Sequence, residues 1–308
     1  MSLDEKGYIQ SKDKTMISGL NENNNMKRNS AYRAQPTHIY PLFKLHKLSK
    51  SEIQAKTIPP HRLVHALKYG PLYRLEKWVS PYLTCLSRTY CGEEYLLDSG
   101  DFLKTVDLLN TSDTLNTYKS LNIFTIDVKA LYPSINPTLA LQALSHAILE
   151  DTAMGDNTKI ALYEMTHFIL DNSFVSHKGV DYRVKKGIPT GGSTSRQLAD
   201  LFLRWMIFKH PDCLSKGNKF WEFILFWKRY IDDLVGLWIG SVRQFSLFVK
   251  DLNVRAAQFG INFDKYQIGK EVDFLDAKCY LERDSNNKIV LHYRLFKKTN
   301  RLQKIPPD

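Results

Sequence analysis

The sequence predicts an α+β fold in which helices are interleaved with antiparallel hairpins. Segments with apolar residues at helical spacing are mixed irregularly with short segments in which polar and apolar residues alternate. These short segments meet at tight turns. The regular βαβα order of a doubly wound parallel sheet does not occur. The 308 residues are 43% hydrophobic, enough to bury one large core or two smaller ones. We therefore expect one catalytic-sized unit with subdomains.

The first residues of the chain are polar. Residues 1–35 are rich in Asn, Ser, Lys and Asp, which predicts a disordered tail. They contain no apolar signal-peptide core, and no window of the chain is long and apolar enough to cross a bilayer. We therefore expect an intracellular protein with no membrane partner. Order should begin near "THIYPLFKLHKL" and pass through a polar loop that closes on Pro59 and Pro60.

Helices and strands are predicted from the period of the apolar residues. The first helix is expected near residues 71–90, where Leu72, Leu75, Trp78 and Val79 recur at helical spacing. Further helices are expected at 101–109, 137–150, 160–172, 193–210 and 242–260. Strands or hairpins are expected at 121–128, 173–184, 223–239, 261–269, 272–282 and 288–296.

Charge and cysteine content narrow the function classes. The formal net charge is +11 and the isoelectric point about 9.3, which favours a polyanionic partner, most simply nucleic acid. Solubility alone is the open alternative. The four cysteines form no CxxC pair and have no His cluster beside them, which argues against zinc and fits a reduced protein with buried thiols.

Two adjacent carboxylates, Asp232 and Asp233, interrupt a strongly apolar hairpin pattern, "FILFWKRYIDDLVGLWI". We expect both at the centre of the turn. A plain turn is one explanation, since Asp is a common turn residue. However, the pair lacks the Gly that tight hairpin turns prefer, and two adjacent negative charges repel each other. A hard divalent cation such as Mg²⁺ would resolve the repulsion, because carboxylates together with substrate phosphates are its usual ligands.

A third carboxylate, Asp127, follows the strand-like run "NIFTI". Taken alone, it is better explained as an exposed strand end or a helix cap. Asp127 from this strand and Asp232 from the hairpin would together bind a pair of metal ions. Such a pair is used in phosphoryl transfer.

The segment "KKGIPTGGSTSRQLADLF" contains Gly187, Gly191 and Gly192, which allow a backbone to approach a ligand closely. A P-loop is a weak explanation because its Gly-Lys-Ser/Thr ending is missing. A loop and helix beneath a base or sugar would use the same features, and a simple loop with a helix cap remains the plain alternative.

Together these segments resemble the palm motifs of reverse transcriptases. "FTIDVKALYPSI", "GIPTGGSTSRQLADLF" and "RYIDDL" resemble the first, second and Tyr-x-Asp-Asp motifs in order and spacing, and "NFDKYQIGKEVDFLDAKCYLE" resembles the fourth and fifth. "IYPLFKLHKL" and "PPHRLVHALKYGPLYRLEKWVSPYL" resemble segments of the Penelope-like family. The resemblance extends from about Tyr40 to the C-terminus.

The resemblance implies a right-hand polymerase with an antiparallel-sheet palm and the thumb largely missing. Fingers with the first palm-contacting helix are expected at 36–120, and the palm core with a fingers insertion at 121–240. The end of the palm, with a primer-grip hairpin, is expected at 241–308. The implied function is that of an RNA-directed DNA polymerase of a retroelement. Its partners would be an RNA or DNA template, a primer and dNTPs, with no prediction of oligomeric state.

Several positions depart from the family pattern. Phe43 stands where the family usually has Pro, and "HRLVHALKYG" replaces an Arg-Pro-Ile-Val run. Gly192 stands where, in the family, a Ser-Pro often follows the first Gly of the loop. The chain ends about where a thumb would begin, without a GIY-YIG nuclease. A non-catalytic nucleic-acid-binding protein and a two-metal nuclease are therefore the competing hypotheses.

The resemblance also implies roles for individual residues. Asp127 and Asp232 would bind two Mg²⁺ ions, or Mn²⁺ as an alternative, with Asp233 and the Val128 carbonyl as further ligands. Tyr132 would exclude a 2′-hydroxyl.

The remaining roles concern substrate contacts. Arg62 and Lys44 would bind the triphosphate, and Lys265 would protonate pyrophosphate. Gly187, Pro189 and Gly191 would form the floor beneath the nucleotide. Tyr230 would lie beside the primer end, and Arg196 and Gln197 would face the template.

Overall fold

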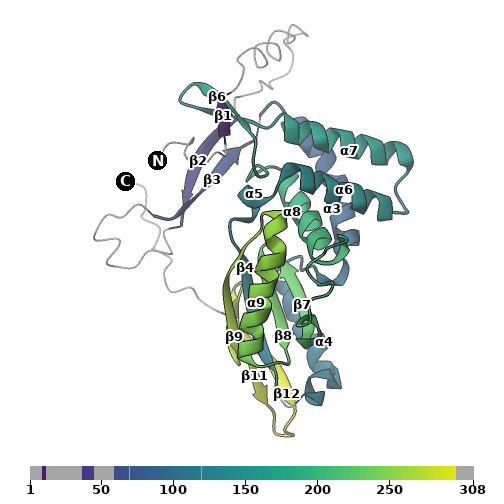
Figure 1. Ribbon diagram of the computed structural model, residues 1–308, viewed down its shortest axis with the longest axis vertical. Coiled ribbons are helices and arrows are strands. Elements are labelled where there is room, and N and C mark those ends of the chain that lie inside the picture. Colours follow the sequence, from purple (N-terminus) through teal and green to yellow (C-terminus); the bar gives the residue numbers. More distant parts are fainter. Residues whose placement is uncertain (1–8, 12–36, 45–58, 69, 119, 296–308) are drawn as a thin grey trace. The chain divides into compact units, whose positions relative to one another are not determined.

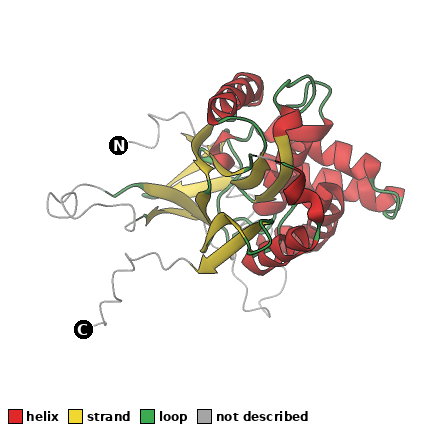
Figure 2. Cartoon of the chain, turned by 90° about the horizontal axis from the view of Figure 1, so that it is seen from below, coloured by secondary structure: helices red, strands yellow, loops and turns green. Residues whose placement is uncertain are grey.

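The computed structural model describes residues 9–11, 37–44, 59–68, 70–118 and 120–295, which form two compact units. Unit 1 contains the described parts of Met1–Ser87 together with Tyr132–Ala199. Unit 2 contains Arg88–Leu131 and the described residues from Asp200 onward. Both units combine helices with antiparallel strands, so the predicted α+β class is confirmed (Figures 1 and 2). The predicted domain assignment stays a prediction.

Unit 1 contains a five-stranded sheet with the order β1-β6-β5-β2-β3. Its strands are β1 (Ile9–Ser11), β2 (His38–Phe43), β3 (His61–Ala66), β5 (Phe174–His177) and β6 (Val180–Val184). The hairpin predicted at 173–184 is confirmed as β5 and β6. Ile9–Ser11 pair with β6, whereas the rest of the tail predicted at 1–35 lies outside the described residues.

Most helices of unit 1 follow the predicted segments. They are α5 (Leu131–Ser134), α6 (Pro137–Glu150) and α7 (Asp156–Asp171), with most of α3 (Tyr73–Cys91) and the start of α8 (Ser195–Arg204). At the start of α6, the Asn136 side chain accepts a hydrogen bond from the Thr138 amide, and Pro137 occupies the first helical turn. The predicted helix at 137–150 is therefore confirmed with its capping mechanism.

Unit 2 is built on a four-stranded antiparallel sheet with the order β7-β8-β4-β9. Its strands are β4 (Asn122–Val128), β7 (Ile224–Tyr230), β8 (Asp233–Trp238) and β9 (Phe263–Gly269). A second, three-stranded sheet contains β10 (Glu271–Phe274), β11 (Ala277–Arg283) and β12 (Ile289–Leu295). Short 3-10 helices occur at Gly92–Glu94, Asp113–Thr117, Trp221–Phe223 and Ala257–Phe259, and a π-helical turn at Trp205–Lys209 follows α8.

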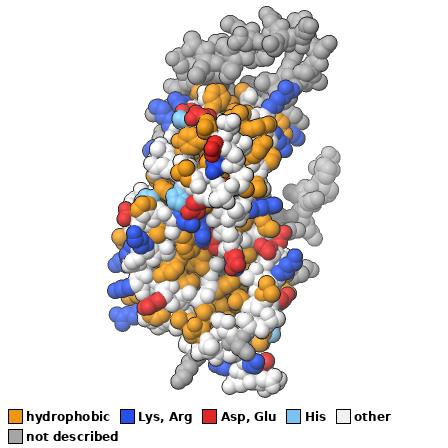
Figure 3. Space-filling model, turned by 90° about the vertical axis from the view of Figure 1, so that its right-hand side faces the viewer, with side chains coloured by type: hydrophobic (Ala, Val, Ile, Leu, Met, Phe, Trp, Pro, Cys, Tyr) orange, Lys and Arg blue, Asp and Glu red, His pale blue; other side chains and the backbone are white. Residues whose placement is uncertain are grey.

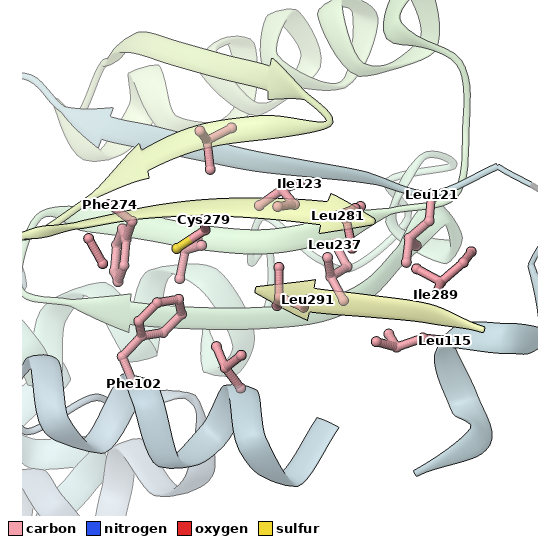
Figure 4. Close-up of a cluster of buried hydrophobic side chains, with 14 of the residues drawn as sticks. Phe102, Leu115, Leu121, Ile123, Leu237, Phe274, Cys279, Leu281, Ile289 and Leu291 are labelled. Atoms are coloured by element: carbon pink, nitrogen blue, oxygen red, sulfur yellow. The ribbon is translucent and has the colours of Figure 1, made fainter. Parts of the chain in front are cut away.

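One hydrophobic core of unit 2 lies where the second sheet meets β4, β8 and helix α4 (Ser99–Thr111). Figure 4 shows side chains from these elements pointing toward one another, with Phe102 beside Phe274. The two rings meet edge to face, with centroids 4.8 Å apart. Ile123 and Leu237 join this cluster from β4 and β8. One face of the four-stranded sheet is thereby buried.

The opposite face of the same sheet is covered by α9 (Val242–Ala256), which Figure 1 shows beside β4, β8 and β9. The Phe245 ring lies 4.9 Å from that of Phe124 and 5.1 Å from that of Trp238. Ser241 and Gln244 form a capping box at the start of α9. With both faces covered, the end of the sheet is where its polar side chains can meet a ligand.

No helix in the described part of the chain is long and apolar enough to span a membrane. The four cysteines are free thiols; Cys91, Cys213 and Cys279 are buried and Cys85 is exposed.

Candidate active site

The three acids meet at one end of the four-stranded sheet of unit 2. Asp127, the penultimate residue of β4, is the direct partner of Asp233, the first residue of β8. The Val128 amide donates a 3.1 Å hydrogen bond to the Asp232 carbonyl, which fixes the hairpin tip against β4. All three carboxylate residues are half-buried. Asp127 and Asp233, 106 positions apart in the sequence, are thus brought together by strand pairing.

The strand register sets the direction of the facing carboxylates. Residues directly opposite in an antiparallel pair point to the same face, and every second residue along a strand shares that face. Ile123 pairs with Leu237, two residues further along Thr125 pairs with Val235, and then Asp127 pairs with Asp233. The carboxylates therefore continue the face that carries the apolar core, beyond the point where that core ends.

The hairpin turn lies one residue earlier than expected. The sequence predicted a turn centred on both acids, whereas the structure places Ile231 and Asp232 in the turn and Asp233 in β8. Tyr230 pairs with Asp233 and closes the hairpin. Ile231 has a φ of 54°, a left-handed conformation that is costly for a β-branched residue. The shift occurs because strand pairing with β4 takes up Asp233.

The donor set at this end of the sheet suits a hard cation. No three His, Cys, Asp or Glu side chains among the described residues gather closely enough to form a metal cage by themselves. Two facing carboxylates with a third beside them fit Mg²⁺, which keeps several waters and is usually completed by substrate phosphates. The residues present therefore fit an ion that binds together with a nucleotide.

Lys265 lies on the other side of β4. Val128 pairs with Phe263 and Ile126 with Tyr266, so two residues of β9, Asp264 and Lys265, oppose the single residue Asp127. Lys265 is exposed. The structure thus places this predicted cation on the strand next to the acids, and its role stays a prediction.

Unit 1 holds the glycine-rich loop against the segment around Tyr132. The Ile188 amide donates to the Tyr132 carbonyl at 2.9 Å. Gly187 has a φ of 75°, and a Cβ there would lie 2.7 Å from the Pro133 Cα atom. Gly191 has a φ of 107°, and its Cβ would lie 2.7 Å from a backbone oxygen of β3. These two glycines are therefore required by close backbone approach as well as by conformation.

The same loop is attached to β3 and α3 by polar groups. The His65 amide donates to the Thr190 carbonyl at 2.8 Å, and the Ser193 amide donates to Glu76 Oε2 at 2.9 Å. The Ser80 hydroxyl donates to the Ser193 carbonyl at 2.9 Å. Burial raises the pKa of Glu76, while the Ser193 amide lowers it. Burial lowers the pKa of His65 to about 4, so its imidazole is neutral at pH 7.

Sequence reasoning missed these loop-holding residues, although α3 carried a signal. The buried stripe of α3 includes Glu76, Val79 and Leu83, whereas Trp78, which the sequence placed on the apolar face, is 44% exposed. A carboxylate within an apolar helical stripe indicates a buried partner. The partner here, the Ser193 amide, is 117 residues away in the sequence.

The other residues of unit 1 predicted to contact substrates lie on β3, just after β2 and on α8. Arg62 is exposed on β3, an edge strand, and the Lys44 amide donates to the Pro60 carbonyl just after β2. Gln197, in the first turns of α8, lies 2.9 Å from the Thr84 hydroxyl of α3 through its side-chain amide. The neighbouring Arg196 is half-buried. Gln197 thus helps to hold α8 to α3, and the template role predicted for both residues stays a prediction.

The fold resembles that of solved telomerase structures, telomerase being a reverse transcriptase. For apo telomerase from Candida tropicalis the TM-score is 0.59 at 12% identity, over 89% of this chain and 49% of that one. For the same enzyme truncated from its C-terminal domain the TM-score is 0.56 at 14% identity, over 86% of this chain and 56% of that one.

A telomerase structure from Candida albicans, in complex with a fragment of telomeric RNA, has a TM-score of 0.56 at 13% identity and covers 86% of this chain and 47% of that one. This chain therefore spans about half the length of the telomerase chains that it resembles. No protein-family model and no curated protein sequence matches the chain.

Proposed function

We propose that the chain is an RNA-directed DNA polymerase of the Penelope-like type, which adds dNTPs to a primer 3′-hydroxyl. The observation that carries this proposal is the pairing of Asp127 with Asp233, with Asp232 beside them at the hairpin tip. The reverse-transcriptase-like fold supports it. The Penelope-like assignment rests on the N-terminal motif "IYPLFKLHKL" and the segment after it.

In this proposal Asp127 and Asp232 bind two Mg²⁺ ions, with Asp233 and the Val128 carbonyl as further ligands and Mn²⁺ as a substitute. When bound, the ions neutralise the charge that develops on the attacking and leaving oxygens. The chain's own contribution is to hold the carboxylate oxygens at one end of the sheet with little freedom of movement. Both flanking faces of the sheet are packed, so the carboxylates are preorganised.

Other residues would bind and orient the substrates. Tyr230, which pairs with Asp233 at the end of β7, would contact the primer end. Lys265, exposed on β9, would donate a proton to pyrophosphate. Tyr132 would exclude the 2′-hydroxyl of an NTP.

The resemblance to reverse transcriptases assigns nucleotide contacts to residues of unit 1. Gly187, Pro189 and Gly191 would form the floor beneath the nucleotide. Arg62 and Lys44 would bind the triphosphate as cations. Arg196 and Gln197 would lie beside the template.

The proposed polymeric partner is RNA or DNA. The chain has 43 Lys and Arg residues against 32 Asp and Glu residues, and a net positive charge is suited to phosphate neutralisation. Figure 3 shows Lys and Arg side chains distributed over one face of the molecule among hydrophobic ones. The Candida albicans telomerase structure is in complex with a fragment of telomeric RNA, which supports nucleic acid as the partner class.

Primer extension on matched RNA and DNA templates tests the proposal, with dNTPs and NTPs in separate reactions and Mg²⁺ present. We expect extension with dNTPs on the RNA template and little or none with NTPs. A preference for NTPs would contradict both the role of Tyr132 and the reverse-transcriptase assignment. Binding of the primer-template without any extension would instead show a non-catalytic nucleic-acid-binding protein, and degradation of labelled primer without dNTPs would show a nuclease.

A further inference from the structure

A buried arginine lies next to the hairpin tip. Arg229 is the penultimate residue of β7, three positions before Asp232, and its side chain is 0% exposed. Its Nη1 atom donates to Asp200 Oδ1 at 2.7 Å, and its Nη2 atom donates to the Asp200 carbonyl at 3.2 Å. Asp200, in α8, is itself 0% exposed. A fully buried guanidinium with two contacts to one residue is held in a single orientation.

The same guanidinium also contacts the turn. Nη1 donates a 3.1 Å hydrogen bond to the carbonyl of Ile231, the residue with the left-handed backbone. A β-branched residue holds this conformation only where its surroundings impose it. Within the described residues, Arg229 therefore joins the middle of α8 to the turn that carries Asp232.

A second ion pair completes the surroundings of Arg229. Its Nη2 atom lies 3.9 Å from Glu94 Oε1 and donates to the Cys91 sulfur at 3.6 Å. Glu94 Oε2 is 2.9 Å from Arg204 Nη1. Two cations and two anions thus offset each other's charge, which makes burial of the group tolerable. The Arg229 carbonyl accepts from the Leu96 amide at 2.8 Å, so the backbone at this position is fixed as well.

We propose that Arg229 is a positioning residue: its buried ion pair with Asp200 and its hydrogen bond to the Ile231 carbonyl hold the strained turn that sets Asp232 beside Asp127. The catalytic consequence rests on the proposed polymerase function. Arg229 itself lies in the core and acts on the reaction only through the turn.

A buried charge left without its partner destabilises a fold strongly, so the pair is best replaced as a pair. The variant Arg229→Met/Asp200→Leu substitutes apolar side chains of similar volume and leaves the Glu94–Arg204 ion pair in place. Such a replacement is commonly neutral or stabilising for the fold. Circular dichroism and thermal unfolding verify that the variant is folded before any other measurement.

Three measurements then test the role of Arg229. Hydrogen exchange at the Val128 amide, whose acceptor is the Asp232 carbonyl, should become faster in the double variant. Mn²⁺ affinity of the protein alone, measured by electron paramagnetic resonance, should fall about tenfold, as for residues that orient ligands. In primer extension, kcat should fall about 100-fold while the KM for dNTP stays unchanged, because the turn and not the nucleotide contacts is altered.

Adding Ile231→Gly to the double variant gives the sharpest control. Gly adopts a positive φ without strain, so the turn no longer needs the Arg229 hydrogen bond. We expect the protection of the Val128 amide from exchange and the Mn²⁺ affinity to be higher in the triple variant than in the double variant. Both should reach the values of the Ile231→Gly single variant. A folded double variant with unchanged exchange and Mn²⁺ affinity would overturn the proposal, as would a triple variant without recovery. If the wild-type chain extends no primer, the polymerase function is wrong, while the exchange measurements still decide the role of Arg229.

Discussion

At the scale of single residues, the site depends on two carboxylates that face each other across a strand pair. Asp127 and Asp233 are direct partners in β4 and β8. Cβ atoms in such a pair lie about 5 Å apart, and like charges there repel each other. A divalent cation bound between the carboxylates, as proposed, would remove this repulsion. Metal binding and stability of the fold should therefore be linked.

We expect Mg²⁺ to raise the Tm of the wild-type chain. At about ten times Kd, an ion that binds only the folded state contributes about 1.4 kcal/mol. Asp127→Asn removes one of the facing carboxylates and should abolish most of this effect. Asp107→Asn, which removes an exposed carboxylate of α4, is the matched control and should keep it. Scanning fluorimetry with and without Mg²⁺ measures the shift; equal shifts in the two variants would contradict the prediction.

A second prediction concerns the buried Glu76. Burial raises its pKa above the usual 4.5, so the ionised form opposes folding, and this cost grows as pH rises above 4.5. Glu76→Gln keeps an acceptor for the Ser193 amide and removes the charge. The variant should be more stable than wild type at pH 7, with the difference shrinking as pH falls toward 4.5.

Urea denaturation at pH 7 and at pH 4 tests the Glu76 prediction. Glu164→Gln, at an exposed position of α7 in the same unit, is the control and should leave stability nearly unchanged at both values. A Glu76→Gln variant that is less stable than wild type at pH 7 would show that the ionised carboxylate stabilises the loop.

At this scale the acids could be predicted from the sequence, whereas the buried residues that hold their turn in place could not. Asp127 and Asp232 interrupt apolar strands, and such an interruption is visible in the sequence itself. Arg229 and Asp200 carry no such signal, because their burial depends on strand and helix packing across 29 residues. A pattern of local periodicity does not contain that contact.

At the scale of elements, the sheet of unit 2 positions the hairpin between two packed faces. The strands β4, β7 and β8 could be predicted because each is an apolar run bounded by polar residues. Their register could not, and the turn was placed one residue too late. The register is set by pairing between β8 and β4, which are more than 100 residues apart in the sequence. Turn chemistry alone does not choose between the two placements.

Gly236 provides a test of this packing. It lies in β8, and a Cβ at this position would collide with the Phe124 ring and the Phe226 carbonyl. We expect Gly236→Ala to lower the free energy of unfolding by about 1–3 kcal/mol, the usual cost of overpacking a core. Gly269→Ala, in the same sheet but with its nearest atom at 3.9 Å, is the control. Similar denaturation midpoints for the two variants would contradict the packing account.

At the scale of the whole molecule, the chain passes between its two units after Ser87, Leu131 and Ala199. Each unit is therefore made of discontinuous segments, which a reading along the sequence does not reveal. The α+β class could be predicted because it follows from the alternation of local patterns. The grouping of distant segments into units depends on tertiary contacts.

The net charge of +11 leads to a prediction about binding. If phosphate neutralisation drives association with a primer-template, the affinity should fall steeply with salt. For about 6–10 phosphate contacts the loss between 50 and 200 mM salt is about 10³–10⁵-fold. Fluorescence anisotropy over a salt series measures the slope. An affinity that does not depend on salt would show that the positive charge serves solubility alone.

The central claim is that the carboxylates at the end of the β4–β8 pair perform nucleotide addition. Single-turnover extension of a labelled primer on an RNA template, with dNTPs and Mg²⁺, tests it most directly. The wild type and Asp107→Asn are predicted to extend the primer at similar rates, whereas folded Asp232→Asn is predicted to extend none while still binding the primer-template. Extension by Asp232→Asn at the wild-type rate would contradict the account.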